Sequence, residues 1–379
     1  MTQPAQLRGL TWDHSRGFDP MIATAKCYGA ARDGVEIIWE KRSLQAFADR
    51  PIEEMTAKYD LMVIDHPHVG DVAEAGLLVA FDTVGRDAEL AMLKAQSVGP
   101  SHISYEIGGH QWGLAIDAAT PVAAFRPDRL TVAPVKWAEV IELARGGDVG
   151  IALIPINALM TFLGMAKNLD MLVADNPDRF IADDDGAYVL ETLCEIVELI
   201  DPRCLTLDPI GIYEWMGRAQ NAPAYSPFGY GYTNYSRAGY CAFPLVFADA
   251  PGFGDNGPRG TVIGGTGIAV SASSKHCDLA VDYAFWIASA ACQSGLFFQS
   301  GGQPGNAVAW ESDACNAACR GFFINTRATL DSSWIRPRYT GYMGFQDVAG
   351  NIIHACLRGE MRIPQTLMAL QIAYLESQK

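Results

Sequence analysis

The first part of the chain alternates between short apolar runs and a longer segment with helical spacing. Residues 7–12, 35–39 and 59–65 predict strands, and the run at 59–65 (YDLMVID) is too continuously apolar for a strand with one solvated face. After the first run, Asp19-Pro20 supplies an N-cap and a first-turn proline for a helix that ends near Ala31. This alternation predicts a parallel α/β sheet, in which ligands bind beyond the carboxyl ends of the strands.

The later pattern contains two extended crossings. Residues 111–125 (QWGLAIDAATPVAAF) predict one crossing, interrupted by Pro121, and residues 258–268 predict a second in glycine-punctuated, extended backbone. The block between them mixes helices, such as the one expected over 187–199, with an aromatic loop at 225–240. Two crossings around a middle block predict two lobes joined by a hinge of two strands.

Composition narrows the class of protein. The chain has 379 residues, of which 49% are hydrophobic and 19% charged, which is enough for two lobes with a core each. No apolar stretch reaches the roughly 20 residues that cross a bilayer, so membrane insertion is not expected. The net charge of −15 argues against nucleic acid, whose partners usually carry a basic surplus. Small-molecule or protein partners are favoured.

The start of the chain and its cysteines bear on location. The segment Met1 to Leu10 (MTQPAQLRGL) has no basic region followed by an apolar run and a cleavage site, so we expect a cytoplasmic protein, or a periplasmic one if an export signal has been removed. Among the nine cysteines, Cys315 and Cys319 are the one close pair. Buried thiols are the favoured interpretation, with a disulfide or metal and redox chemistry as alternatives.

One segment resembles a known family. Residues 264–289 (GGTGIAVSASSKHCDLAVDYAFWIAS) are similar to the return strand, Ser-Lys turn and following helix of the type II, or cluster B, periplasmic solute-binding proteins of ABC transporters, in their sugar-binding family 1 branch. Residues 112–128 fit that family's first hinge crossing, and residues 300–310 fit its loop that returns toward the cleft. The chain departs from the family in lacking an export signal.

The resemblance implies an α/β fold of two lobes, with a two-strand hinge and a ligand cleft between the lobes. Residues 1–115 plus 263–305 would form the N-terminal lobe, and residues 116–262 plus 306–379 the C-terminal lobe. A transporter permease would be a partner only if the protein is exported. The wider fold also includes enzymes, such as the chorismate dehydratase of menaquinone synthesis, so the fold alone does not set the function.

The first candidate site follows the first strand. Asp13, His14 and Arg16 precede the expected helix start, where backbone N–H groups and the helix dipole favour an anion. Arg16 and His14 would add positive or hydrogen-bonding groups. A capping loop whose polar residues satisfy one another is the alternative.

The second candidate site closes the third strand. Pro67 restricts His66 to extended backbone, so His66 and His68 are expected to project to the same side, with Asp65 opposite. Histidine titrates near neutral pH and a carboxylate fixes its tautomer, so these residues would be catalytic if the protein is an enzyme. Structural hydrogen bonding and a metal site are the alternatives, although the spacing supplies no third and fourth metal ligand.

Aromatic residues form a third group of candidates. His110 and Trp112 lie at the first crossing, where the resemblance implies contact with ligand. Tyr230, in the aromatic loop, and Trp310 could stack on a sugar or aromatic ring. Packing of these side chains without ligand is equally compatible with the sequence.

Arg336 and Arg338 flank a proline and precede Tyr339 in an otherwise acidic chain. Two guanidinium forks could bind a carboxylate or phosphate, and together with Arg16 they would make an anion clamp. Ion pairs with surface carboxylates are the alternative.

These features predict a receptor for a small polar, anionic organic ligand, either a carboxylate or a sugar-like compound, with no cofactor and no metal. The alternative is a cytosolic, cofactor-independent lyase, dehydratase or isomerase that uses His66, His68 and Asp65. Residues 264–267 (GGTG) lack the glycine spacing of a dinucleotide-binding fingerprint, and no Walker motif is present.

Overall fold

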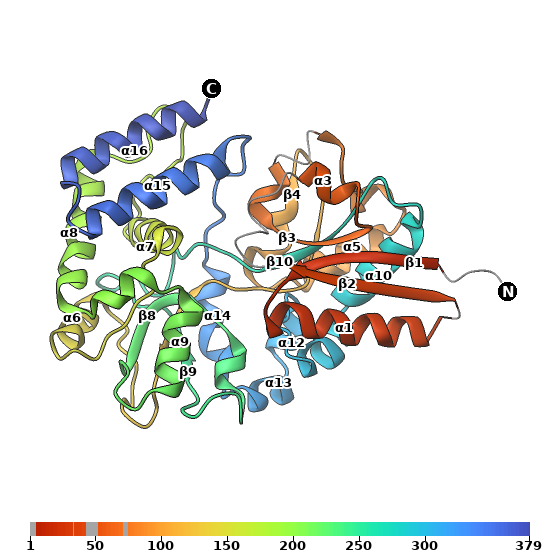
Figure 1. The fold of residues 1–379 in the computed structure, drawn as a ribbon, viewed down its shortest axis with the longest axis horizontal. Helices are drawn as coiled ribbons and strands as arrows, with labels where there is room; N and C mark the ends of the chain where they lie inside the picture. Colours follow the sequence, from red (N-terminus) through yellow and green to blue (C-terminus); the bar gives the residue numbers. More distant parts are fainter. Residues whose placement is uncertain (1–4, 33, 43–51, 71–74) are drawn as a thin grey trace. The chain divides into compact units, whose positions relative to one another are not determined.

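The computed structural model describes residues 5–32, 34–42, 52–70 and 75–379. Its chain forms two compact units (Figure 1). Unit 1 comprises residues 1–119 and 264–315, and unit 2 comprises residues 120–263 and 316–379. Each unit is therefore built from two separate stretches of sequence.

Unit 1 contains a five-stranded sheet in the order β2 (Val35–Arg42), β1 (Ala5–Trp12), β3 (Leu61–Asp65), β10 (Thr266–Val270), β6 (Leu114–Ala115). β1 is parallel to β2 and β3, as the sequence predicts, whereas β10 is antiparallel to β3 and β6. The parallel arrangement predicted from the first three strands is therefore confirmed. The sheet as a whole is mixed, because β10, from the second stretch of sequence, joins it in the antiparallel direction.

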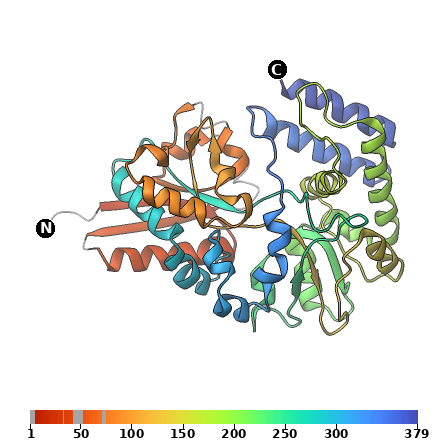
Figure 2. The same ribbon diagram turned by 180° about the vertical axis from the view of Figure 1, so that it is seen from behind.

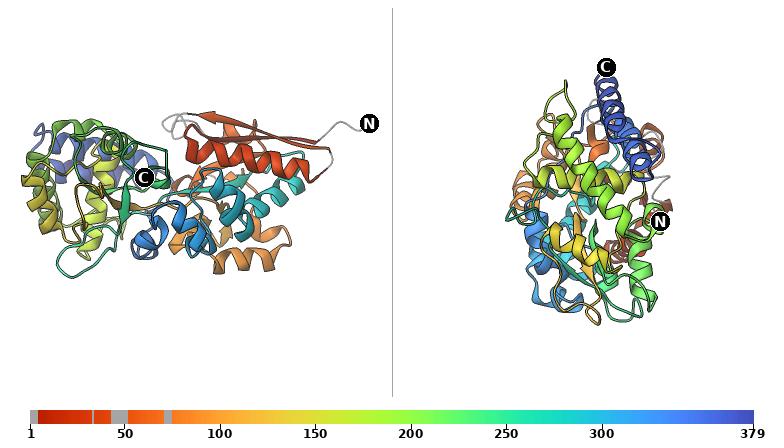
Figure 3. Two further views of the ribbon diagram at one scale, coloured as in Figure 1. Left: turned by 90° about the horizontal axis from the view of Figure 1, so that it is seen from below. Right: turned by 90° about the vertical axis from the view of Figure 1, so that its left-hand side faces the viewer.

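Helix α1 (Ser15–Ala30) lies against β1 and β2 (Figure 3). It begins before Asp19, so the predicted start was wrong and Pro20 lies inside the helix. The reason is that His14 already acts as the N-cap, because its Nδ1 accepts a hydrogen bond from the backbone N–H of Arg16 at 3.0 Å. The helix α10 (Cys277–Ala288) packs on α1, where Tyr28 Oη donates to Asp282 Oδ2 at 2.7 Å.

A core cluster of unit 1 packs on one face of β1, β3 and β10 and includes Leu10, Met62, Ile64, Trp112 and Ala269. The remaining elements of this unit are short, apart from α5. They are η1 (His66–His68), η2 (Phe81–Thr83), η3 (Gly99–Ser101), η4 (Ile103–Tyr105), β4 (Glu106–Ile107), β5 (His110–Gln111), α3 (Ile52–Thr56), α5 (Asp87–Ala95), α11 (Ala290–Cys292), the π-helical turn η7 (Gln293–Phe297) and α12 (Ala307–Trp310); α13 (Asp313–Ala318) spans the boundary at residue 315.

Unit 2 contains a three-stranded antiparallel sheet in the order β8 (Tyr225–Tyr230), β7 (Pro121–Phe125), β9 (Val246–Ala248). The predicted aromatic loop at 225–240 thus begins as a buried strand, because its side chains pack in the core of this unit. The sheet is accompanied by α6 (Trp137–Arg145), α7 (Pro155–Asn168), α8 (Asp183–Leu199), η5 (Pro202–Thr206), α9 (Pro209–Arg218), η6 (Thr233–Ser236), α14 (Phe322–Asp331), α15 (Tyr342–Leu357) and α16 (Ile363–Ser377).

The C-terminal helices α15 and α16 lie side by side and pack on α7 and α8 (Figure 2). Gly350 of α15 allows a close approach to α7, since a Cβ at this position would lie 2.8 Å from the carbonyl oxygen of Pro155. The predicted strands at 7–12, 35–39 and 59–65 and the helix at 187–199 are confirmed as parts of β1, β2, β3 and α8. The sequence predicted that the two lobes divide at residues 115, 262 and 305. The two units of the structure divide at residues 119, 263 and 315.

Candidate functional site

The carboxyl ends of β1 and β3 and the first residue of β10 meet at one edge of the unit 1 sheet, where Thr266 pairs with Asp65. We define the polar edge of unit 1 as the side chains gathered there or directly behind it: Trp12, His14, Arg16, Asp65, His66, Tyr105, Asp117 and Thr266. The sheet edge where parallel strands end is where α/β folds bind ligands.

His14 and Asp13 occupy the turn between β1 and α1. The His14 ring stacks on the Trp12 ring, with 5.3 Å between centroids and 9° between planes. Asp13 is exposed and forms an ion pair with Lys41, with 2.7 Å between Oδ1 and Nζ. His14 therefore caps α1, as the capping alternative expected. It also belongs to an aromatic stack at the polar edge.

Arg16 and Asp117 form a buried ion pair at this edge. Arg16 Nε donates to Asp117 Oδ2 at 2.7 Å, and Arg16 Nη2 donates to Asp117 Oδ1. Only 3% and 4% of the two side chains are exposed. Burial raises the pKa of the Asp117 carboxyl, and the adjacent Arg16 guanidinium opposes this rise. The pair places a donor fork and a carboxylate, fixed in orientation, behind the strand ends.

The backbone around Gly265 holds Asp117 in place. Asp117 N–H donates to Thr266 O at 3.0 Å, and Thr266 N–H donates to Asp117 O at 3.0 Å. Gly265 has a φ of +92°, and a Cβ there would lie 2.3 Å from the carbonyl oxygen of Asp117. Glycine is thus required on both conformational and steric grounds.

His66, His68 and Asp65 do not adopt the predicted extended arrangement. Residues 66–68 form the 3₁₀ turn η1, with Asp65 as its extended N-cap and Pro67 in its first turn. Positions 66 and 68 are about two thirds of a turn apart in such a helix, so the prediction that both histidines project to one side was wrong. The expectation that Pro67 keeps His66 extended was also wrong, because His66 begins the turn and Asp65 is the last extended residue.

His66 is buried, and its ring meets Tyr105 edge-on with 6.4 Å between centroids. Tyr105 Oη donates to the carbonyl oxygens of Ile64 at 3.2 Å and Gly265 at 3.4 Å. Tyr105 therefore connects the end of β3 with the start of β10. His68 is half-buried, and a catalytic role for either histidine stays a prediction.

His110 lies in β5, and Trp112 directly follows this strand. His110 is exposed, and its Nδ1 lies 2.8 Å from Asp82 Oδ2. Trp112 packs in the core, and its Nε1 donates to Ile107 O at 3.1 Å. Their rings meet edge-on at 5.7 Å. The contacts of Trp112 favour packing, the alternative that the sequence left open.

Trp310 is buried in α12 and its Nε1 donates to Pro304 O at 2.7 Å. Pro304 in turn forms a β-bridge with Asp117. Trp310 thus supports the backbone behind the Arg16–Asp117 pair, and a stacking role for it stays a prediction.

In unit 2, three of the predicted residues lie near Tyr342. Burial raises the pKa of the Tyr342 hydroxyl, Arg336 opposes this rise, and Tyr339 and Tyr230 add to it. The rings of Tyr339 and Tyr342 meet edge-on, with 5.6 Å between centroids. We call these four residues the tyrosine–arginine cluster of unit 2.

Within this cluster, Arg336 is buried and its Nη1 donates to Gln346 Oε1 at 2.5 Å. Tyr339 Oη lies 2.8 Å from Ser377 Oγ. Arg338 is half-buried and lies two residues after Arg336. Because Gln346 is neutral, its contact with Arg336 does not compensate the charge of the guanidinium.

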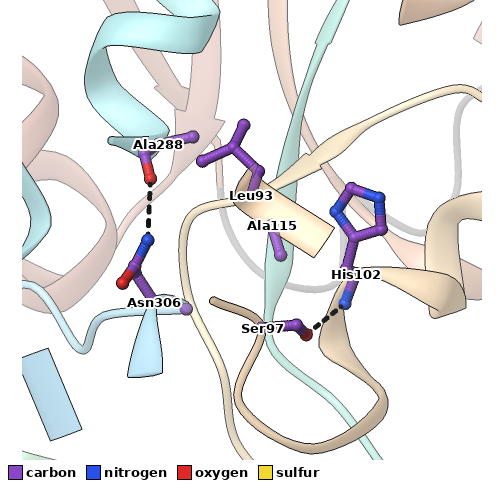
Figure 4. A pocket seen from close by; sticks show the side chains of 7 residues that line it. Leu93, Ser97, His102, Ala115, Ala288 and Asn306 are labelled. Carbon is purple, nitrogen blue, oxygen red and sulfur yellow. Dashed lines mark hydrogen bonds between the residues drawn. The ribbon is translucent and has the colours of Figure 1, made fainter. Parts of the chain in front are cut away.

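A small cavity lies inside unit 1, next to β6. It measures about 10 Å³ and is lined by residues that include Ser97, His102, Ala115 and Asn306 (Figure 4). Ser97 Oγ accepts a hydrogen bond from the His102 backbone N–H at 2.9 Å, and Asn306 Nδ2 donates to Ala288 O at 3.5 Å. This volume holds about one water molecule and is too small for an organic solute.

Three residues of these sites were not predicted from the sequence, namely Asp117, Tyr105 and Tyr342. Asp117 carried a usable signal, because it is the one charged residue in the run at 111–125 and a buried carboxylate needs a partner. Tyr105 and Tyr342 carried none, since their importance comes from contacts with residues distant in the sequence.

Cys315 and Cys319 are both buried, and Cys315 Sγ donates to the carbonyl oxygen of Ser294 at 3.5 Å. Within residues 5–32, 34–42, 52–70 and 75–379, no group of three or more His, Cys, Asp or Glu side chains is placed to hold a metal ion. No helix in these same ranges has both the length and the apolar character that crossing a membrane requires.

This architecture, with a mixed sheet in a discontinuous first unit, is that of the type II solute-binding proteins of ABC transporters, so the predicted fold is confirmed. The MalE3 protein of T. maritima with bound maltose matches with a TM-score of 0.83 and 14% identity, over 97% of this chain and 98% of that chain. An ABC transporter solute-binding protein from Agrobacterium radiobacter K84 in complex with ribitol matches with a TM-score of 0.79 and 18% identity, over 99% and 98%.

A third structure, an ABC transporter solute-binding protein from Thermotoga lettingae TMO with bound α-D-tagatose, matches with a TM-score of 0.80 and 15% identity, over 99% of this chain and 100% of that chain. No protein-family model and no curated protein sequence matches the chain. At these identities the structural matches establish the fold alone. The expected cytoplasmic location and the predicted cleft between lobes stay predictions.

Proposed function

We propose that this protein is a receptor for a small sugar or sugar alcohol, and that the polar edge of unit 1 supplies part of its binding surface. The Arg16–Asp117 pair is the main support, because it fixes a donor fork and an acceptor at the sheet edge where α/β folds bind ligands. Hydroxyl groups both donate and accept hydrogen bonds, so a paired guanidinium and carboxylate suit them. Solved proteins with this fold hold maltose, ribitol and tagatose, which supports the same ligand class.

The charges of the Arg16–Asp117 pair and of the tyrosine–arginine cluster bear on whether the ligand is neutral or anionic. Asp117 compensates the charge of Arg16, so this pair favours a neutral solute over the anionic ligand predicted from the sequence. In the tyrosine–arginine cluster, Arg336 contacts the neutral Gln346, which keeps the anionic alternative open to test. A membrane permease as partner is a further prediction that depends on export.

The test is calorimetric titration of the full chain with ribitol, α-D-tagatose, maltose and ribonate, the last being the carboxylate that corresponds to ribitol. Binding of at least one neutral compound, tighter than that of ribonate, is the expected result. Tighter binding of ribonate would support the anionic ligand instead. If none of the four binds, the proposed ligand class is wrong.

A pair of isosteric variants locates the site. Asp117→Asn keeps the side-chain shape but removes the charge-assisted contact, so we expect the bound sugar to lose about tenfold in affinity. Asp82→Asn, a carboxylate of unit 1 that contacts His110 instead of Arg16, is the matched control and should bind normally. Thermal melting of both variants separates lost affinity from lost folding. Unchanged affinity in folded Asp117→Asn would exclude the polar edge as the site.

A further inference from the structure

Unit 2 contains a groove that the proposed sugar site does not use. Its lining comes from α6 and α8, which are neighbouring helices (Figure 1), and from Phe253 and Gly254. Its volume is about 510 Å³. Small-molecule sites typically measure about 300 to 1,000 Å³. All its lining residues belong to unit 2, and none belongs to the polar edge or the tyrosine–arginine cluster.

Aromatic side chains form one wall of the groove. Phe253 stacks on the buried Trp137, with 6.0 Å between centroids and 28° between planes, and lies 6.3 Å from Tyr188. Tyr188 is 49% exposed, although it is a large ring on a stable helix. Trp137 therefore fixes Phe253 from behind, and Tyr188 extends the aromatic surface toward solvent. Such a surface suits the apolar body of a ligand or a cation over a ring.

Carboxylates line the other part of the groove. Tyr188, Glu191 and Glu195 are spaced by three and four residues, so they share one face of α8. Glu195 pairs with Arg145 at 3.1 Å, and Lys136 at the rim pairs with Asp255 at 2.8 Å. Glu191 lines the groove and forms no ion pair with any residue in the part of the chain that the structure describes. The groove thus combines aromatic faces with an uncompensated negative charge, on a protein of net charge −15.

We propose that this groove binds an organic cation with an aromatic or alkyl body. Its ammonium group would face Glu191, and its body would lie over Tyr188 and Phe253. A neutral apolar compound would gain the aromatic contacts but not the charge contact. An anion would be repelled by Glu191 and Glu195.

The test titrates the full chain with 2-phenylethylammonium and with 2-phenylethanol, which has the same body without the charge, using ligand-observed NMR at low salt. We expect the ammonium compound to bind about fivefold more tightly, which is the order of gain that an exposed charge contact gives. Glu191→Gln should remove this difference, and Tyr188→Ala should weaken both compounds. Glu198→Gln is the matched control, because Glu198 is exposed on α8 but does not line the groove.

Equal affinity for the two compounds, no binding of either, or a charge preference that survives Glu191→Gln would each overturn the proposal. The three substituted positions are exposed, so the variants should fold, and thermal melting verifies this. Sugar titration of Glu191→Gln should give the wild-type result. The groove and the polar edge are in this way tested separately.

Discussion

Arg16 and Asp117 stand 101 residues apart in the sequence, yet they form a two-pronged ion pair inside unit 1. One residue comes from the first turn of α1 and the other from the crossing that follows β6. The pair therefore fastens the first helix of the chain to the segment that leaves unit 1. A fork-to-carboxylate contact also fixes orientation, which a lysine at position 16 would not do.

Asp117→Ala should lower the free energy of unfolding by about 3 to 5 kcal/mol, because it leaves the buried Arg16 guanidinium without its carboxylate. Urea unfolding measures this loss. The control is Asp255→Ala, whose carboxylate is 96% exposed in its pair with Lys136 and should cost less than about 1 kcal/mol. The double variant Arg16→Met with Asp117→Leu should be more stable than Asp117→Ala alone. Equal losses of unfolding free energy in Asp117→Ala and Asp255→Ala would contradict a stabilising role for the Arg16–Asp117 pair.

Gly265→Ala should destabilise unit 1 more than a left-handed glycine normally does. Its Cβ would lie 2.3 Å from the Asp117 carbonyl oxygen, so the strand must shift. Gly85→Ala is the control, because Gly85 also has a positive φ, of +74°, but nothing lies within 4 Å of the added Cβ. The control should lose about 1 to 2 kcal/mol on denaturant unfolding, and Gly265→Ala clearly more. Similar losses would show that the close approach to Asp117 is unimportant.

His102 should make stability depend on pH. Burial lowers the pKa of His102 to about 4, and the positive charge of Lys94 adds to this shift. As pH falls from about 6.5, His102 takes up a proton in the unfolded chain but stays neutral in the folded chain. The free energy of unfolding therefore declines until about pH 4. The total decline from this group is about 3 kcal/mol at most.

The measurement is urea unfolding at several pH values between 4 and 8, compared for the wild type and His102→Asn. The variant should show a flatter profile over this interval. His276→Asn, which changes an exposed histidine, should keep the wild-type slope. A profile that His102→Asn leaves unchanged would place the pH dependence on other groups.

His14→Ala should remove the cap of α1 and cost about 0.5 to 2 kcal/mol. The substitution also removes the stack on Trp12, so a second variant separates the two effects. His14→Asn keeps an acceptor for the Arg16 N–H but loses the ring, and it should recover most of the lost stability. Failure of asparagine to rescue would assign the contribution of His14 to the stack.

Much of unit 1 was predicted from the sequence, because the patterns that indicate strands and helices depend only on residues that are neighbours in the chain. The strand at 7–12 and the apolar run at 59–65 were predicted from spacing and composition. The direction of β10 was not, because nothing within residues 266–270 states which strand it will join. The turn at His66 was missed because a residue before proline usually avoids helical backbone, whereas His66 begins the turn η1.

The candidate site was predictable only in part. Arg16 and His14 were predicted from their place after the first strand, whereas the carboxylate that engages Arg16 lies in a distant apolar segment. Arg336, Tyr339 and Tyr230 were chosen for their chemistry, and the side chain that relates them, Tyr342, has no distinguishing pattern around it.

The late arrival of β10 has a consequence for synthesis of the chain. β3 lies between β1 and β10, so until residues 266–270 leave the ribosome one side of β3 has no partner strand. An unpaired apolar strand edge is prone to join other chains. More than two thirds of the polypeptide must therefore be made before unit 1 can close its sheet, and chains truncated between residues 120 and 263 should aggregate or recruit chaperones.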